Sequence, residues 1–82
     1  MTLELYSEVA LTQNIADHNL KVGDVATLVD FVPHPEGGEE GCVLEVFNAL
    51  GESIGVLTVP ISAVKSLSAS EILTTRSLKQ VS

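Results

Sequence analysis

The fold is decided by one stretch of the chain, LKVGDVATLVDF at residues 20–31. Gly23 permits the positive φ that a tight turn into a strand often needs, and Asp24 is suited to accept hydrogen bonds from neighbouring backbone N–H groups. We predict that these two residues form a structural turn. The residues after them alternate with a period of two and are largely apolar on both faces, which predicts a long strand covered on both sides for part of its length.

Upstream of this stretch the chain predicts an entry strand and a short turn. Residues 5–11 alternate with a period of two, as in a half-buried strand. Residues 15–19 are too few for a full helix and predict a single helical or 3₁₀ turn, with Asn14 as its cap and Asn19 at a left-handed position.

Downstream, short apolar runs are separated by turn residues. We expect a loop at residues 33–41, a strand at 42–47, a turn at 48–52 and a strand at 53–59. A 3₁₀ turn at 61–64 and a last strand at 65–67 should follow. Gly51 takes the positive-φ position of the turn, Gly55 marks a bend or bulge, and Pro60 ends the ladder because it has no N–H to donate. The whole predicts a small all-β barrel of about five antiparallel strands at residues 1–67.

Residues 68–82 form a C-terminal tail of different character. Ser68 and Glu71 fit a capping box, and Ile72, Leu73, Leu78 and Val81 give an imperfect apolar stripe. Two alternatives stay open: a short helix packed on the barrel or on a second chain, and a frayed or disordered terminus.

The charge of the chain constrains its partners. The 82 residues form one domain with a net charge of −7. Residues 1–67 hold ten acids and two lysines, a charge of −8, whereas the tail carries +1. A body this acidic repels phosphate backbones and anionic membrane surfaces, so nucleic acid is disfavoured and a basic protein is the favoured partner.

The cysteine count and the hydropathy suggest a location. Cys42 is the only cysteine, so no disulfide within the chain is expected, which suits a reducing cytoplasm. No apolar run approaches the roughly 20 residues that span a bilayer, and the N-terminal residues begin with acids, unlike a secretory signal. We therefore expect a cytoplasmic protein with no membrane segment.

The loop at residues 33–41 carries the densest group of potential ligands. They are His34, Glu36, Glu39 and Glu40, followed by Cys42. Their spacing matches no known metal-ligand pattern and the loop is poorly preorganised, so we expect no metal and no cofactor. A solvated acidic loop is the plain interpretation, and a contact with a partner is the functional one.

The sequence contains no strong candidate for a set of catalytic residues. Asp17 and His18 are adjacent on a turn with no nucleophile placed near them, and the glutamates before Cys42 would raise the pKa of its thiol. We predict that the protein is not an enzyme. Outward positions are expected for Glu8, Asp30, Glu45 and Glu52, which together would form an acidic face.

The strings VALT at 9–12, LKVGDVATLV at 20–29 and LEVFN at 44–48, with Gly51-Glu52, resemble a family of short bacterial proteins known as domain of unknown function family 4926. That family usually has glycine where this chain has Ala26. The resemblance covers about residues 9–67 and implies a soluble SH3-like barrel without assigned catalytic residues. The second string also resembles the start of a KOW motif, although the basic residues of RNA-binding KOW barrels are missing here.

Two functions remain as hypotheses. The first is a non-enzymatic protein-interaction module, with an antitoxin- or immunity-like role as a subtype in which acids cover a partner's basic, nucleic-acid-facing site. The alternative is a KOW-type barrel associated with nucleic acid or the ribosome. Self-association through a strand edge or the tail is compatible with either.

Overall fold

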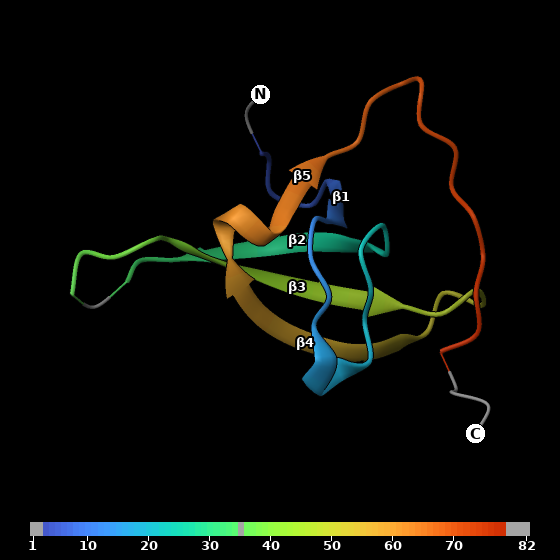
Figure 1. Cartoon of the computed structure of the whole chain (residues 1–82), viewed down its shortest axis with the longest axis horizontal. Coiled ribbons are helices and arrows are strands. Elements are labelled where there is room, and N and C mark those ends of the chain that lie inside the picture. Colours follow the sequence, from blue (N-terminus) through green and yellow to red (C-terminus); the bar gives the residue numbers. More distant parts are fainter. Residues whose placement is uncertain (1–2, 35, 79–82) are drawn as a thin grey trace.

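The protein is an antiparallel β-sheet with two short 3₁₀ turns. The computed structural model describes residues 3–34 and 36–78. The elements, labelled in Figure 1, are β1 (Glu8–Leu11), η1 (Ala16–His18), β2 (Val25–Val32), β3 (Gly41–Phe47), β4 (Ser53–Pro60), η2 (Ile61–Ala63) and β5 (Val64–Ser66). The five strands form one sheet in the order β4-β3-β2-β1-β5. This confirms the prediction of an all-β fold of about five antiparallel strands.

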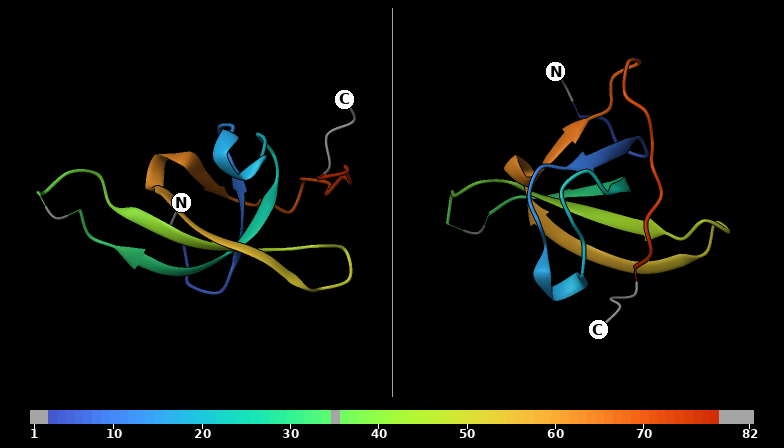
Figure 2. Two further views of the ribbon diagram at one scale, coloured as in Figure 1. Left: turned by 90° about the horizontal axis from the view of Figure 1, so that it is seen from below. Right: turned by 45° about the vertical axis from the view of Figure 1, so that its right-hand side comes forward.

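The sheet is strongly bent around the apolar core (Figure 2). The largest fully buried side chains are those of Val9, Leu11, Leu28, Cys42 and Leu44. Alternation in β3 explains the burial, because Cys42, Leu44 and Val46 face the core while their neighbours are only half-buried or exposed. Within the described residues β4 pairs with β3 and β5 with β1, and no ladder joins β4 to β5. Hydrogen-bonded closure of the barrel therefore stays a prediction.

The turn before β2 has the expected geometry. Gly23 has φ +91°, and the Asp24 carboxylate accepts a hydrogen bond of 2.8 Å from the Lys21 N–H. Asn19 is left-handed at φ 55°, as predicted. The prediction for Asn14 was wrong, because Ile15 occupies the N-cap of η1 and the Asn14 Oδ1 instead accepts the Val22 N–H at 2.9 Å.

A β-bulge divides β2 into two parts. Leu28 pairs with Leu44 and Asp30 with Val43, which leaves Val29 as an extra residue. Because of this extra residue, Phe31 lies opposite the buried Cys42 and packs against the core, while Asp30 points away from it. Simple alternation from Leu28 would place Asp30, not Phe31, on the core side.

The entry strand is shorter than predicted. β1 begins at Glu8 because a turn precedes it, in which Tyr6 has φ 64° and the Ser7 N–H donates to the Glu4 carbonyl at 3.3 Å. The β3–β4 turn agrees with prediction, with Gly51 at φ 81°. A second bulge leaves Ile54 unpaired beside Gly55, where a bend or bulge was expected.

The tail begins with half of a capping box and no helix follows. The Ser68 N–H donates to the Glu71 Oε1 at 2.7 Å, whereas the Ser68 hydroxyl contacts Ser70. Residues 71–78 have no regular structure and run along one side of the molecule (Figure 1). The short-helix alternative is therefore wrong for residues 68–78, and Val81 lies outside the described residues. One turn of capping does not offset the cost of starting a helix when β-branched residues follow.

In the described ranges, neither of the short 3₁₀ turns nor any other helix has the length and apolarity needed to cross a membrane.

Candidate functional site

The sheet brings three of the four predicted outward acids onto one face. Thr27 pairs with Glu8 on one side and with Glu45 on the other, so these residues form a row across β1, β2 and β3. Residues in register share a face, and Asp30 lies on the same face because it pairs with Val43, two residues before Glu45. We call Glu8, Asp30 and Glu45 the acidic sheet face. Glu52 lies apart in the β3–β4 turn, where its Oε1 accepts the Asn48 Nδ2–H at 2.8 Å.

None of the ion pairs within residues 3–34 and 36–78 includes an acid of the acidic sheet face. These ion pairs are Lys65 with Glu71 at 3.0 Å and Arg76 with Asp24. Lys65 is in register with Ala10, two residues after Glu8, so it borders the acidic sheet face, but its partner is Glu71. Two strand spacings separate Glu8 from Glu45, about 10 Å, which is comparable to the Debye length at physiological salt. The carboxylates therefore reinforce one negative potential.

Apolar side chains lie between these acids. Val56 continues the row beyond Glu45 and is 58% exposed, and Val43 is half-buried beside Asp30. β4 also forms an edge of the sheet in the observed strand order. The surface thus combines negative charge, exposed valine and an unpaired strand edge, which are features of a protein-binding surface.

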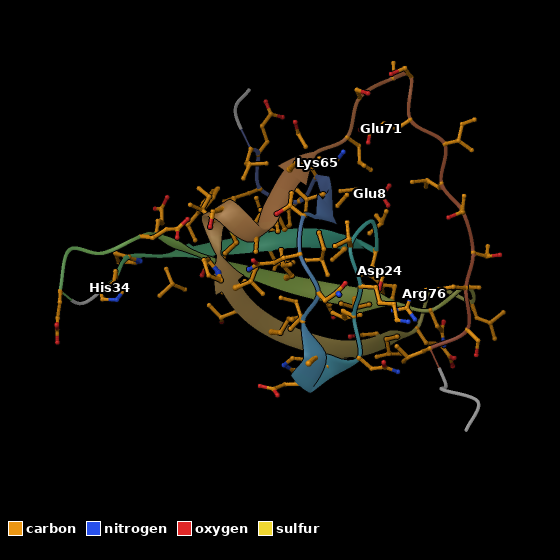
Figure 3. All side chains as sticks on the ribbon, in the orientation of Figure 1. Glu8, Asp24, His34, Lys65, Glu71 and Arg76 are labelled. Carbon is orange, nitrogen blue, oxygen red and sulfur yellow. The ribbon has the colours of Figure 1, made fainter. Side chains whose placement is uncertain are left out.

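The loop residues predicted to contact a partner are not gathered into one site. His34 lies toward the loop tip (Figure 3), where its Nδ1 accepts the Glu36 N–H at 3.1 Å and its ring lies against Gly38. The Glu39 carboxylate instead accepts the Ser62 N–H at 2.8 Å, in the first turn of η2. The Glu40 carbonyl accepts the neighbouring Ile61 N–H at 2.9 Å. The base of the loop therefore has a structural role that the sequence did not reveal.

The remaining titratable groups offer little chemistry. Cys42 is fully buried, and desolvation, reinforced by Glu40 and Glu39, raises the pKa of its thiol. Asp17 and His18 are both exposed on η1. In the described ranges no three His, Cys, Asp or Glu side chains are grouped as metal ligands would be.

An open depression of about 570 Å³ lies between the N-terminal segment, β2 and β5. Its walls are mainly apolar, and its lining consists of Leu3, Phe31, Glu40, Ile61, Val64, Lys65 and Ser66. Glu40 and Lys65 are the charged residues of this lining.

The turn at Gly23 and Asp24 has a partner that the sequence did not suggest. The Asp24 carboxylate accepts hydrogen bonds from the Lys21 N–H and from the guanidinium of Arg76, which belongs to the tail (Figure 3). The hydrogen bond from Arg76 is the main reason why the pKa of Asp24 is lowered. A basic tail on an acidic body was the only available signal, and it does not specify which acid the arginine binds.

Comparison with known proteins provides no relative: no family model, no curated protein and no solved structure matches the chain.

Proposed function

We propose that this protein is a non-enzymatic interaction module whose acidic sheet face binds a basic protein. The observation that carries the proposal is the register of β1, β2 and β3, which gathers Glu8, Asp30 and Glu45 on one face, with none of the three in an ion pair within the described ranges. Opposite charge on a partner would relieve the repulsion among these carboxylates and speed encounter.

The exposed Val56 supports a protein as the ligand rather than a free cation or a polyamine. An apolar side chain in line with the acids gains from contact with another apolar surface, and the edge of β4 offers backbone groups as well. An antitoxin- or immunity-like role fits this chemistry, because such a surface would cover a basic, nucleic-acid-facing site of its partner. The resemblance to family 4926 adds no other role, since that family has none assigned.

The test is capture of partners from cells of the source organism with three forms of the full chain. The first is wild type, and the second carries Glu8→Gln, Asp30→Asn and Glu45→Gln. The third is a matched control with the same change in charge at exposed acids elsewhere, Glu4→Gln, Asp17→Asn and Glu36→Gln. We expect a basic protein that binds wild type and the control at about 50 mM salt, binds less at 500 mM, and is lost with the second form.

A partner retained equally by all three forms would overturn the assignment to the acidic sheet face. Recovery of no protein at either salt concentration would count against the interaction module itself. Gel-shift measurements with RNA and DNA at low ionic strength address the KOW-type alternative, for which the acidic body predicts no binding.

A further inference from the structure

The C-terminal tail is attached to the body at two separate points. Near its start, Glu71 pairs with Lys65 of β5 at 3.0 Å. Near its described end, Arg76 reaches the turn before β2, and the intervening chain passes along the side of the molecule without regular structure (Figures 1 and 2). Ile72 and Leu73 between the two points are 87% and 58% exposed. The tail therefore buries little apolar surface and depends on a few contacts.

The second attachment point recognises an arginine. The Arg76 Nε donates to the Asp24 Oδ1 at 2.8 Å, and an Arg76 terminal nitrogen donates both to the Asp24 Oδ2 and to the Asn19 carbonyl, the latter at 2.9 Å. The receiving groups are fixed by the body, because Asp24 also accepts the Lys21 N–H and Asn19 holds a left-handed turn. A carboxylate and a carbonyl set in this way match the planar fork of a guanidinium.

The surface around Asn19 also contacts the backbone and the apolar side chain of Leu78. The Asn19 side-chain amide donates to the Leu78 carbonyl, two residues after the arginine. Leu78 adjoins a small cavity of about 40 Å³, whose lining includes the core residues Leu20, Val46 and Leu57. Leu78 stays 42% exposed, so it covers this apolar surface only in part.

We propose that Asn19, Leu20, Asp24 and Leu57 form a docking groove for an extended peptide segment of a partner protein that carries arginine and, two residues later, leucine. In this structure the chain's own Arg76–Leu78 occupies the groove. The groove does not include the acidic sheet face, so the inference stands apart from the proposed function. The tethered tail competes for the groove at an effective concentration in the millimolar range. A partner segment therefore binds measurably only when its affinity and concentration outweigh those of the tail, or when the tail is displaced.

The test uses the full chain with its groove emptied by Arg76→Ala and Leu78→Ala, two exposed tail positions. The probe is a fluorescein-labelled peptide with the sequence of residues 72–78, ILTTRSL, titrated by fluorescence polarisation. We expect it to bind the emptied variant at least about tenfold more tightly than wild type, because the tethered competitor is gone. Adding Asp24→Asn to the emptied variant, or replacing the arginine of the peptide by alanine, should abolish binding. Amide chemical-shift changes should centre on Asn19, Leu20 and Asp24.

Three results would overturn the proposal. They are no binding of the peptide to the emptied variant at several millimolar, equal binding to wild type and variant, and binding that survives Asp24→Asn. Sedimentation of wild type provides a further check. A dimer that Arg76→Ala dissolves would assign the groove to the tail of a second copy and would overturn its assignment to a different protein.

Discussion

Arg76 forms a two-pronged ion pair with Asp24, which lies 52 residues earlier in the chain. The pair joins the tail to the turn that begins β2, and the Asp24 side chain is 20% exposed there. One carboxylate thus serves two purposes, since it closes its own turn through Lys21 and holds the tail through Arg76.

Loss of the charge on Asp24 should release the tail while leaving the turn in place. In Asp24→Asn, the side-chain oxygen can still accept the Lys21 N–H, but the ion pair with Arg76 is gone. We expect faster trypsin cleavage after Arg76, measured by mass spectrometry, with little change in the far-UV spectrum. Glu36→Gln provides a control at an exposed acid in the loop of His34, which lies at the opposite end of the molecule from Arg76 (Figure 3), and cleavage as fast in this control would contradict the assignment.

Attachment of the tail should depend on acid pH. Arg76 holds the pKa of Asp24 below its ordinary value of 3.8, so the folded state binds the proton less readily than the unfolded state does. The stabilisation is fully present above the unfolded pKa and is lost as the pH falls through the lowered folded value. NMR shifts of the Leu78 methyl groups, followed from pH 6 to pH 2, should report release in the acid range.

Arg76→Gln is the matched control for this titration. The pKa of Asp24 should return toward its ordinary value, and the acid transition of the Leu78 methyl groups should disappear because the tail is already detached. A transition that persists unchanged in Arg76→Gln would show that another group, such as Glu71, controls the tail. The pKa of Glu71 is also lowered, first by its hydrogen bond with the Ser68 N–H.

Substitution of Gly23 should cost stability through backbone strain alone. A Cβ at this position would meet nothing within 4 Å, but φ is +91°. We expect Gly23→Ala to lower the free energy of unfolding by about 1–2 kcal/mol, measured by urea denaturation. Gly55→Ala is the control, because its Cβ also meets nothing within 4 Å and its φ is not in the strained range. Equal losses in the two variants would contradict this explanation.

Glu39 should contribute to stability through its contact with η2. Glu39→Ala removes the acceptor of the Ser62 N–H and should lower the free energy of unfolding by about 0.5–1.5 kcal/mol, the net value of one hydrogen bond. Glu39→Gln keeps a side-chain oxygen and should retain most of the stability. Glu36→Ala, in the same loop, should have little effect, and a comparable loss there would indicate a general effect of charge.

Cys42 should be unreactive in the folded protein. Its side chain is fully buried and the pKa of its thiol is raised, so little thiolate is exposed to a reagent. We expect labelling by Ellman's reagent near neutral pH to be slower than in urea-unfolded protein by on the order of a hundredfold or more, because reaction requires opening of the core. Comparable rates in the two states would show that the interior is accessible.

Local sequence rules predicted most of the fold. Turns at Gly23 and Gly51, a bulge beside Gly55 and the end of the ladder at Pro60 follow from what glycine and proline permit in the backbone. The bulge at Val29 could not be predicted, because valine is an ordinary strand residue and the extra residue is accommodated only through pairing with β3. That bulge is what places Phe31 against the core and Asp30 on the acidic sheet face.

The candidate sites were less predictable, for a related reason. Outward positions for Glu8 and Glu45 follow from alternation, whereas that of Asp30 depends on the bulge at Val29. The common face of the three acids depends on the register of three strands. The sequence predicts a solvated loop or a partner contact for Glu39 and Glu40, whereas the Glu39 carboxylate and the Glu40 carbonyl accept hydrogen bonds from the backbone of η2.

The sequence by itself determined the strand class, the positions of the turns and the excess of negative charge, because these depend on backbone preference, short-range alternation and composition. Only the tertiary structure decided which acids lie together, that the described tail is extended, and that Arg76 meets Asp24. Contacts between residues far apart in sequence depend on how the strands pair, and composition does not encode that pairing.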